Sequence, residues 1–236
     1  MINLRQTIHV VAILFFSSCA ELQQVVNQLP QTKETNANMM ANGLREALNF
    51  GIDRQVKKLT QKDGFFRNEL VKILLPDELR KVDKALRDIG LDKIADEGLR
   101  VLNRAAEDAV KEATPIFVSA VKNITFNDAK SILLGGNNAA THYLKQNTET
   151  ALYQKFQPVI ERSFSKVGAN EIWRTLIQKY NNLPFTKDIT TDLTAYVTGE
   201  TLNGVYKMIG IEEQNIRTKL NSRTTDLLRR VFALQD

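Results

Sequence analysis

Cysteine is nearly absent from this chain, and histidine, proline and glycine are scarce. One cysteine among 236 residues excludes a disulfide within the chain, and two histidines are too few for the clusters that bind zinc. With 5 prolines and 11 glycines, the composition disfavours a turn-rich all-β fold. Stability must come from a hydrophobic core, which 43% hydrophobic residues in a chain of this length can supply.

A large excess of charge of one sign is also missing. The chain has 32 basic and 27 acidic residues, a net charge of +5 and a pI near 9.2. Basic and acidic residues alternate, as in RKVDKALRD at 80–88, and no stretch has the basic run of a nucleic-acid-binding arm. We therefore expect no nucleic-acid partner.

The apolar run near the N-terminus is too short to cross a membrane. It spans residues 8–16, whereas a transmembrane helix needs about 20 apolar residues. A basic residue precedes the run, and the small residues SSCA at 17–20 follow it, which is the order of a secretory signal. We therefore expect residues 1–18 to be a signal peptide.

The tetrapeptide FSSC at 16–19 resembles a bacterial lipobox, although leucine is commoner than phenylalanine at its first position. The resemblance implies that the Cys19 thiol receives a diacylglyceryl group, that the chain is cut before it and that the new amine is acylated. Several acyl chains, at about 0.8 kcal/mol per buried CH₂, would anchor the protein stably. Two alternatives stay open, namely cleavage after Ala20 by ordinary signal peptidase and a retained N-terminal helix in which Cys19 is packed.

Lipidation would place the protein in the bacterial cell envelope, anchored to a membrane, with its domain facing the periplasm. The sequence does not distinguish the inner from the outer membrane. Residues 19–38 are rich in glutamine, asparagine and threonine and include Pro30, so they predict a polar tether. Fully extended, the part at 21–38 would reach about 60 Å.

Residues 39–236 are expected to form one all-α domain, a compact multi-helix bundle. Apolar residues recur three or four positions apart over 41–59, and no alternating run is long enough for a sheet. The clearest helix is 92–114, whose alanine-rich stripe would let a neighbouring helix approach closely. We expect this helix to be central, with Leu102 and Ala106 buried.

Local signals divide the rest of this region into further helices. Pro115 is expected to interrupt the helix before it, and Pro158 to kink or split a later one. The sequence TFND at 125–128 has the spacing of a capping box, and the glycines at 135–136 end the short helix that follows. A last amphipathic helix is expected in SRTTDLLRRVF at 222–232.

Several long segments carry a resemblance to a known family. They are LNRAAEDAV at 102–110, the stretch 115–148 containing NITFNDAKSILLGGNNAATHYLK, YVTGETLNGVYKMIGIEEQNIR at 196–217 and RTTDLLRRVF at 223–232. With these segments the chain resembles the bacterial domain of unknown function 4197 family, from about residue 40 to residue 232. The resemblance implies an exported all-helical domain, and it brings no established activity or functional residues.

The sequence shows no recognisable catalytic or metal-binding set. His142 is the one histidine outside the expected signal peptide, and no G-x-S-x-G motif is present. The acidic pairs Glu212–Glu213 and Asp188/Asp192 lack calcium-loop spacing, and we interpret them as solvated helix acids. We therefore expect no cofactor and no metal, and we favour a non-enzymatic protein.

One corner of the chain could bind an anion. The glycines at 135–136 permit a tight reversal, after which backbone N–H groups at the start of the next helix would face outward near Asn137 and Asn138. His142 and Lys145 follow within two turns, so these four residues form a candidate anion site. The alternative is that Asn138 caps the helix and His142 is an ordinary surface residue.

These features leave three hypotheses for function. The favoured one is a non-enzymatic envelope module that binds a partner protein or a small ligand. An envelope hydrolase would need two inward-facing acids with raised pKa in one cleft. A domain lying on anionic membrane would use basic residues such as Arg223, Arg229 and Arg230, although three cations near one short helix are common on surfaces.

Overall fold

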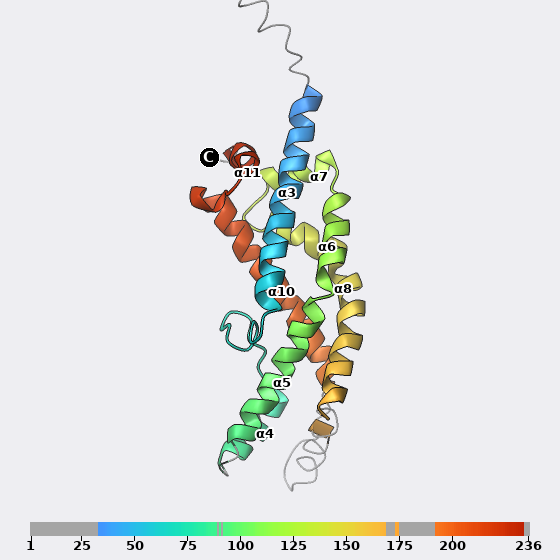
Figure 1. Cartoon of the computed structure of the whole chain (residues 1–236), viewed down its shortest axis with the longest axis vertical. Coiled ribbons are helices and arrows are strands. Elements are labelled where there is room, and N and C mark those ends of the chain that lie inside the picture. Colours follow the sequence, from blue (N-terminus) through green and yellow to red (C-terminus); the bar gives the residue numbers. More distant parts are fainter. Residues whose placement is uncertain (1–32, 89, 91, 169–172, 175–191, 234–236) are drawn as a thin grey trace, which may run out of the picture. The chain divides into compact units, whose positions relative to one another are not determined.

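The computed structural model describes residues 33–88, 90, 92–168, 173–174 and 192–233. Every regular element within these ranges is a helix, which confirms the predicted all-α class (Figure 1). The expected signal peptide at 1–18, the lipid-attachment residue Cys19 and Asp188 lie outside the described residues. The chain divides into Met1–Met39 and Met40–Asp236, and the fold considered below is that of the second unit.

The helices follow one another with connections of varied length. They are α3 (Lys33–Leu59), α4 (Asp77–Asp88), α5 (Asp92–Val110), α6 (Ala113–Lys122), α7 (Phe126–Leu134), α8 (Ala139–Lys166), α10 (Leu193–Thr218), the short 3₁₀ helix η1 (Leu220–Ser222) and α11 (Asp226–Phe232). No helix in the described part of the chain has the length and apolar character needed to span a membrane.

Helix α3 begins at Lys33, ahead of the expected domain boundary at residue 39. Residues 33–38, part of the expected tether, therefore belong to this helix, while the chain divides after Met39, beside the expected boundary. The segment after Pro30 contains neither proline nor glycine, so nothing in it stops a helix from extending toward the N-terminus. Further along α3, apolar residues such as Leu44 and Ile52 turn inward and are buried, as their spacing predicts.

The break between α5 and α6 falls earlier than Pro115. We expected one helix over 92–114, but α5 ends at Val110 and α6 begins at Ala113. A proline ring clashes with the carbonyl four residues before it, which here is that of Lys111. In the first turn of α6 the proline costs nothing, because backbone N–H groups at that position have no partner within the helix.

Helix α8 continues through Pro158, which we expected to kink or split it. Buried side chains lie on both sides of the proline, with Leu152 and Phe156 before it and Ile160 and Phe164 after it. Packing of this stripe against the core holds the helix together despite one missing N–H donor. Of the two outcomes expected at Pro158, the split is therefore absent.

Helices α5 and α8 share the centre of the bundle. Helix α8 packs against α5, α6, α7 and α10, and α5 also packs against α4, α6 and α10 (Figure 1). Leu102 and Ala106 are fully buried, as predicted. The small side chains of Ala105, Ala106 and Ala109 allow α8 to approach α5 closely. The helix expected to be central is thus one of two.

The predicted capping box is confirmed at the start of α7. Thr125 accepts a hydrogen bond from the backbone N–H of Asp128, and Asp128 accepts one from the backbone N–H of Thr125. The Thr125 hydroxyl also donates to the Asp128 carboxylate at 2.7 Å, and this bond, together with the one from the Thr125 backbone N–H, lowers the pKa of Asp128. The box fixes where α7 begins, and α7 leads directly into the corner before α8.

Candidate functional site

A tight corner between α7 and α8 positions the candidate site. A Cβ on Gly135 would lie 2.7 Å from the Cβ of Ala139 and 2.8 Å from the carbonyl oxygen of Ser131, so no side chain fits there. A Cβ on Gly136 would meet nothing within 4 Å. The reversal predicted from the two glycines is present, and the first of them is the one that the packing requires.

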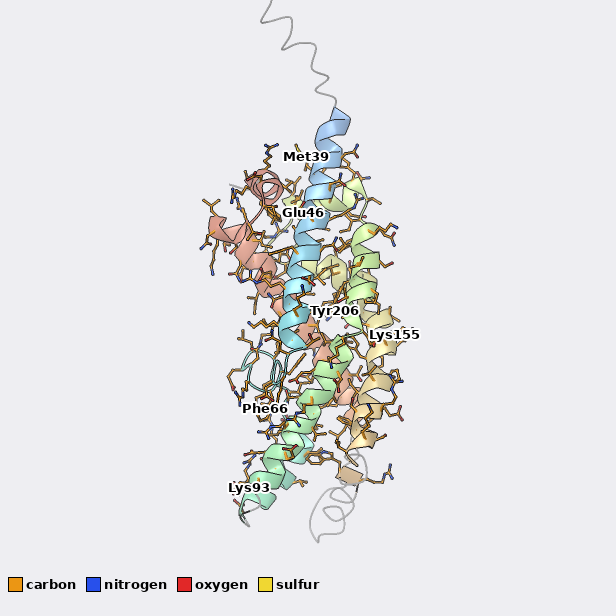
Figure 2. The ribbon with its side chains drawn as sticks, in the orientation of Figure 1. Met39, Glu46, Phe66, Lys93, Lys155 and Tyr206 are labelled. Atoms are coloured by element: carbon orange, nitrogen blue, oxygen red, sulfur yellow. The ribbon has the colours of Figure 1, made fainter. Side chains whose placement is uncertain are left out.

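An open groove of about 420 Å³ lies between the start of α8 and the second half of α10. The α8 side contributes Asn138, Thr141, His142 and Lys145, and the α10 side contributes Tyr206, Lys207, Gly210, Ile211 and Gln214. Tyr206, which is labelled in Figure 2, lines the groove, whereas Lys155, which is also labelled, lies on α8 outside it. Three of the four residues proposed from the sequence therefore line one groove, and Asn137 does not.

The N-terminus of α8 is already occupied by a carboxylate of the protein itself. The backbone N–H groups of Ala140 and Thr141 donate to the two oxygens of Glu213, at 2.9 and 2.8 Å, and the Thr141 hydroxyl donates to the same side chain. The sequence had led us to expect these N–H groups to be free for an external anion. It had also offered Asn138 as the cap, and the Asn138 side chain makes no capping bond.

Glu213 is buried, which overturns our interpretation of Glu212–Glu213 as solvated acids. Its side chain is 5% exposed and pairs at 2.8 Å with Arg217, whose side chain is 4% exposed. Arg217 also donates to the carbonyl oxygen of Ile132 in α7, at 2.8 Å. One ion pair on α10 therefore joins the C-terminus of α7 to the N-terminus of α8 and satisfies backbone groups of both.

Glu212 is buried as well, on the side of α10 that faces α3. It accepts hydrogen bonds from Arg54 at 3.0 Å and from Gln55 at 2.8 Å. The sequence hints only at the pairing of Glu213 with Arg217, because these two residues are one helical turn apart. That spacing is equally typical of an exposed pair, so it could not have indicated burial.

Basic residues dominate the charge of the groove. His142, Lys145 and Lys207 line it, and no acidic residue does, because Glu213 is turned toward the helix start and Arg217. Lys145 has an exposed partner, Glu149, at 3.6 Å, and such a pair contributes only a few tenths of a kcal/mol. Lys207 is exposed and makes no ion pair within the described residues. Both lysines are therefore available to an anion.

Tyr206 and Gly210 shape the α10 side of the groove. The Tyr206 hydroxyl is 2.8 Å from that of Thr148, and burial raises the pKa of Tyr206 to about 12, so this hydroxyl stays neutral. A Cβ on Gly210 would lie 3.5 to 3.7 Å from Thr141 and Asn138, which is ordinary contact distance. The glycine is therefore not required by packing, and its small size keeps the groove open.

Two further charged groups, Arg223 and Glu107, have structural partners. Arg223, which we had treated as a surface cation, is 2% exposed and donates to the carbonyl oxygens of Ile216 and Arg217. Glu107 is buried and accepts hydrogen bonds from the backbone N–H groups of Asp63 and Phe65, which fixes the loop after α3. Within the described residues no group of three or more histidine, cysteine or acidic side chains could hold a metal ion.

Comparison with known proteins identifies the family and nothing finer. The family described as "Protein of unknown function (DUF4197)" matches residues 34–233, which is most of the chain and includes both sides of the groove. Comparisons with curated proteins and with solved structures gave no match. The resemblance noted in the sequence is confirmed, and the chain belongs to the DUF4197 family.

Proposed function

We propose that this protein is a non-enzymatic binding module of the bacterial cell envelope, anchored through lipid on Cys19, and that it binds a small anionic ligand in the groove between α8 and α10. One observation carries the ligand proposal, namely a groove lined by three basic side chains and by no acid. An exposed ion pair contributes roughly 0.2–1 kcal/mol, so the two lysines together favour an anion by about the factor of ten that the test below measures.

The volume of the groove agrees with that of a ligand site. Its volume of about 420 Å³ lies within the range of roughly 300–1,000 Å³ typical of small-molecule pockets. Its sides come from two helices that are fixed to each other by the Glu213 carboxylate and by the Thr148–Tyr206 hydrogen bond. A preformed groove of this kind costs little reorganisation when a ligand binds.

The envelope location rests on the FSSC segment and not on the fold. A lipid on Cys19 would hold the domain near a membrane, and the polar residues after it would separate the two. A hydrolase would need a pair of acids in a cleft, and the groove lining contains none. Binding is therefore the function that this groove supports best.

The test is calorimetric titration of the full chain in neutral detergent with inorganic phosphate and with acetate. We expect at least one of these anions to bind, and we expect Lys145→Gln combined with Lys207→Gln to weaken that binding about tenfold or more. Lys155→Gln removes the same charge from an exposed position of α8 outside the groove, and it should leave binding unchanged. Equal loss in both variants, or no binding by the wild type, would refute the proposal.

A further inference from the structure

The two ends of the groove differ in character. Helices α8 and α10 are antiparallel, because Ala140 contacts Glu213 while Thr148 contacts Tyr206. This direction sets Lys145 and Lys207 toward the Tyr206 end, and it sets Asn138 and Gln214 toward the other. A helix rises about 1.5 Å per residue, so the two ends are roughly 10 Å apart along α10. One end is therefore cationic and the other carries neutral amides.

From this asymmetry we infer, on the basis of the anion-binding function proposed above, that the ligand is a phosphate ester of a small polyol. Its phosphate lies between Lys145 and Lys207, and its hydroxylated body extends over Gly210 toward Asn138 and Gln214. The same chemistry occurs in a soluble metabolite and in the headgroup of a phospholipid. The groove thus defines the chemical class of the ligand, and the experiments below distinguish a soluble metabolite from a phospholipid headgroup.

The cationic end favours a phosphate over a carboxylate. A phosphate monoester carries about −1.5 to −2 charges at neutral pH and three terminal oxygens. Lys145 and Lys207 belong to different helices and both line the groove. His142 lines it as well, and its Nε2 lies 2.9 Å from Nε2 of Gln146. Two ammonium groups, each with three N–H donors, match the three oxygens and the higher charge of a phosphate better than they match the two oxygens and single charge of a carboxylate.

The neutral end favours a hydroxylated body. The side-chain amides of Asn138 and Gln214 each offer donors and an acceptor, which is what a ligand hydroxyl requires. The Thr141 hydroxyl gives its proton to Glu213, so its oxygen remains free to accept a hydrogen bond from the ligand. Gly210 has no side chain in this part of the groove, which is narrow, because a Cβ there would lie 3.5 to 3.7 Å from Thr141 and Asn138.

The experiment compares four soluble probes by titration calorimetry on the full chain in neutral detergent. Glycerol 3-phosphate carries both parts of the expected ligand, inorganic phosphate and glycerol carry one part each, and glycerate carries the body with a carboxylate. We expect glycerol 3-phosphate to bind at least about tenfold more tightly than glycerate or inorganic phosphate. Glycerate that binds as tightly as glycerol 3-phosphate would overturn this inference and leave the anion-binding proposal intact. Failure of every anion to bind would overturn both.

A glycine substitution tests the orientation of the ligand. Gly210→Leu should fill the groove over α10 and lower the affinity for glycerol 3-phosphate at least about tenfold, while inorganic phosphate binds as before. Gly199→Leu is the matched control, since Gly199 is on the same helix and a Cβ there would meet nothing within 4 Å. The proposed orientation is refuted if Gly210→Leu binds glycerol 3-phosphate as tightly as the wild type does. It is also refuted if this variant keeps its melting temperature but loses affinity for inorganic phosphate to the same extent as for glycerol 3-phosphate.

Soluble dihexanoyl phosphatidic acid distinguishes the two sources. It presents the same phosphate on a glycerol that carries two short acyl chains, and it is compared with glycerol 3-phosphate in the same detergent. Tighter binding of the lipid assigns the groove to a membrane headgroup, and tighter binding of glycerol 3-phosphate assigns it to a free metabolite. If the Lys145→Gln, Lys207→Gln double variant binds both compounds as tightly as the wild type does, the groove is not their binding site and the inference is refuted.

Discussion

Glu213 is the residue whose role differs most from what its position in the sequence indicates. Its carboxylate accepts hydrogen bonds from two backbone N–H groups and one hydroxyl of α8, and it pairs with Arg217. Charged pairs at this depth are costly to break, because the remaining partner is left buried without compensation. The helix-terminus chemistry predicted from the sequence is therefore present, but the anion is internal.

Glu213→Gln should destabilise the fold by about 3–5 kcal/mol, since it leaves the Arg217 charge without its carboxylate partner. The measurement is the free energy of unfolding in urea at neutral pH. Glu161→Gln removes a carboxylate from an exposed position of α8 and should change this free energy by less than about 0.5 kcal/mol. Similar small losses in both variants would show that the buried pair contributes little.

Glu107 should make stability depend on pH in the opposite sense to a typical salt-bridged acid. Burial raises the pKa of Glu107 above its ordinary value of 4.5, although backbone hydrogen bonds oppose the shift. The folded chain therefore holds this proton more tightly than the unfolded chain does. Its contribution to stability is fully present below pH 4.5 and is lost as pH rises through the raised pKa.

The measurement for Glu107 is the unfolding free energy of the wild type and of Glu107→Gln at a series of pH values from about 4 to 7, the range in which an acid with a raised pKa titrates. We expect the wild type to lose stability relative to the variant as pH rises across this range. A relative gain would mean that the hydrogen bonds from Asp63 and Phe65 outweigh desolvation.

Among the secondary-structure elements, the sequence predicted which segments are helical better than it predicted where each helix ends and which other helices it packs against. The capping box at Thr125 and the alanine stripe of α5 depend on residues close together in the chain, and both were predicted correctly. The α8 side of the groove was also found, because Asn138, His142 and Lys145 share one face of a single helix.

The α10 side of the groove could not be predicted in this way. Lys207 and Gly210 meet α8 only through tertiary packing, more than sixty positions away in the chain, and no local pattern marks them. The burial of Glu212 and Glu213 was missed for a related reason. Pattern analysis assigns acids to solvent, and, apart from Arg217 on α10 itself, the groups that compensate these two lie on other helices.

The two adjacent glycines at the corner between α7 and α8 should differ in their effect on stability when each is replaced by alanine. Gly135→Ala should destabilise the protein by about 1–3 kcal/mol, because its Cβ would overlap Ala139 and the Ser131 carbonyl. Gly136→Ala should change the stability by less than about 0.5 kcal/mol, since its Cβ has open space. Thermal unfolding of both variants checks this, and equal shifts would contradict the described corner.

At the scale of the whole molecule, the proposed attachment to a membrane rests on Cys19. Cys19→Ser should abolish labelling by a fatty-acid probe and leave an uncleaved precursor or a soluble protein. Ser18→Ala keeps a small residue at the neighbouring position and should label normally. Membrane fractionation and mass that do not change in Cys19→Ser would exclude lipidation at this site.

The buried Glu213–Arg217 pair also determines how the molecule opens. Amide protons in the first turn of a helix usually exchange quickly with water, because helix ends fray. Here the N–H groups of Ala140 and Thr141 are held by a carboxylate of α10, which is itself joined to α7 through Arg217. Their partner is thus part of a set of bonds that joins three helices. In hydrogen–deuterium exchange these two amides should therefore be among the slowest in the protein, so the start of α8 belongs to the last part of the fold to open.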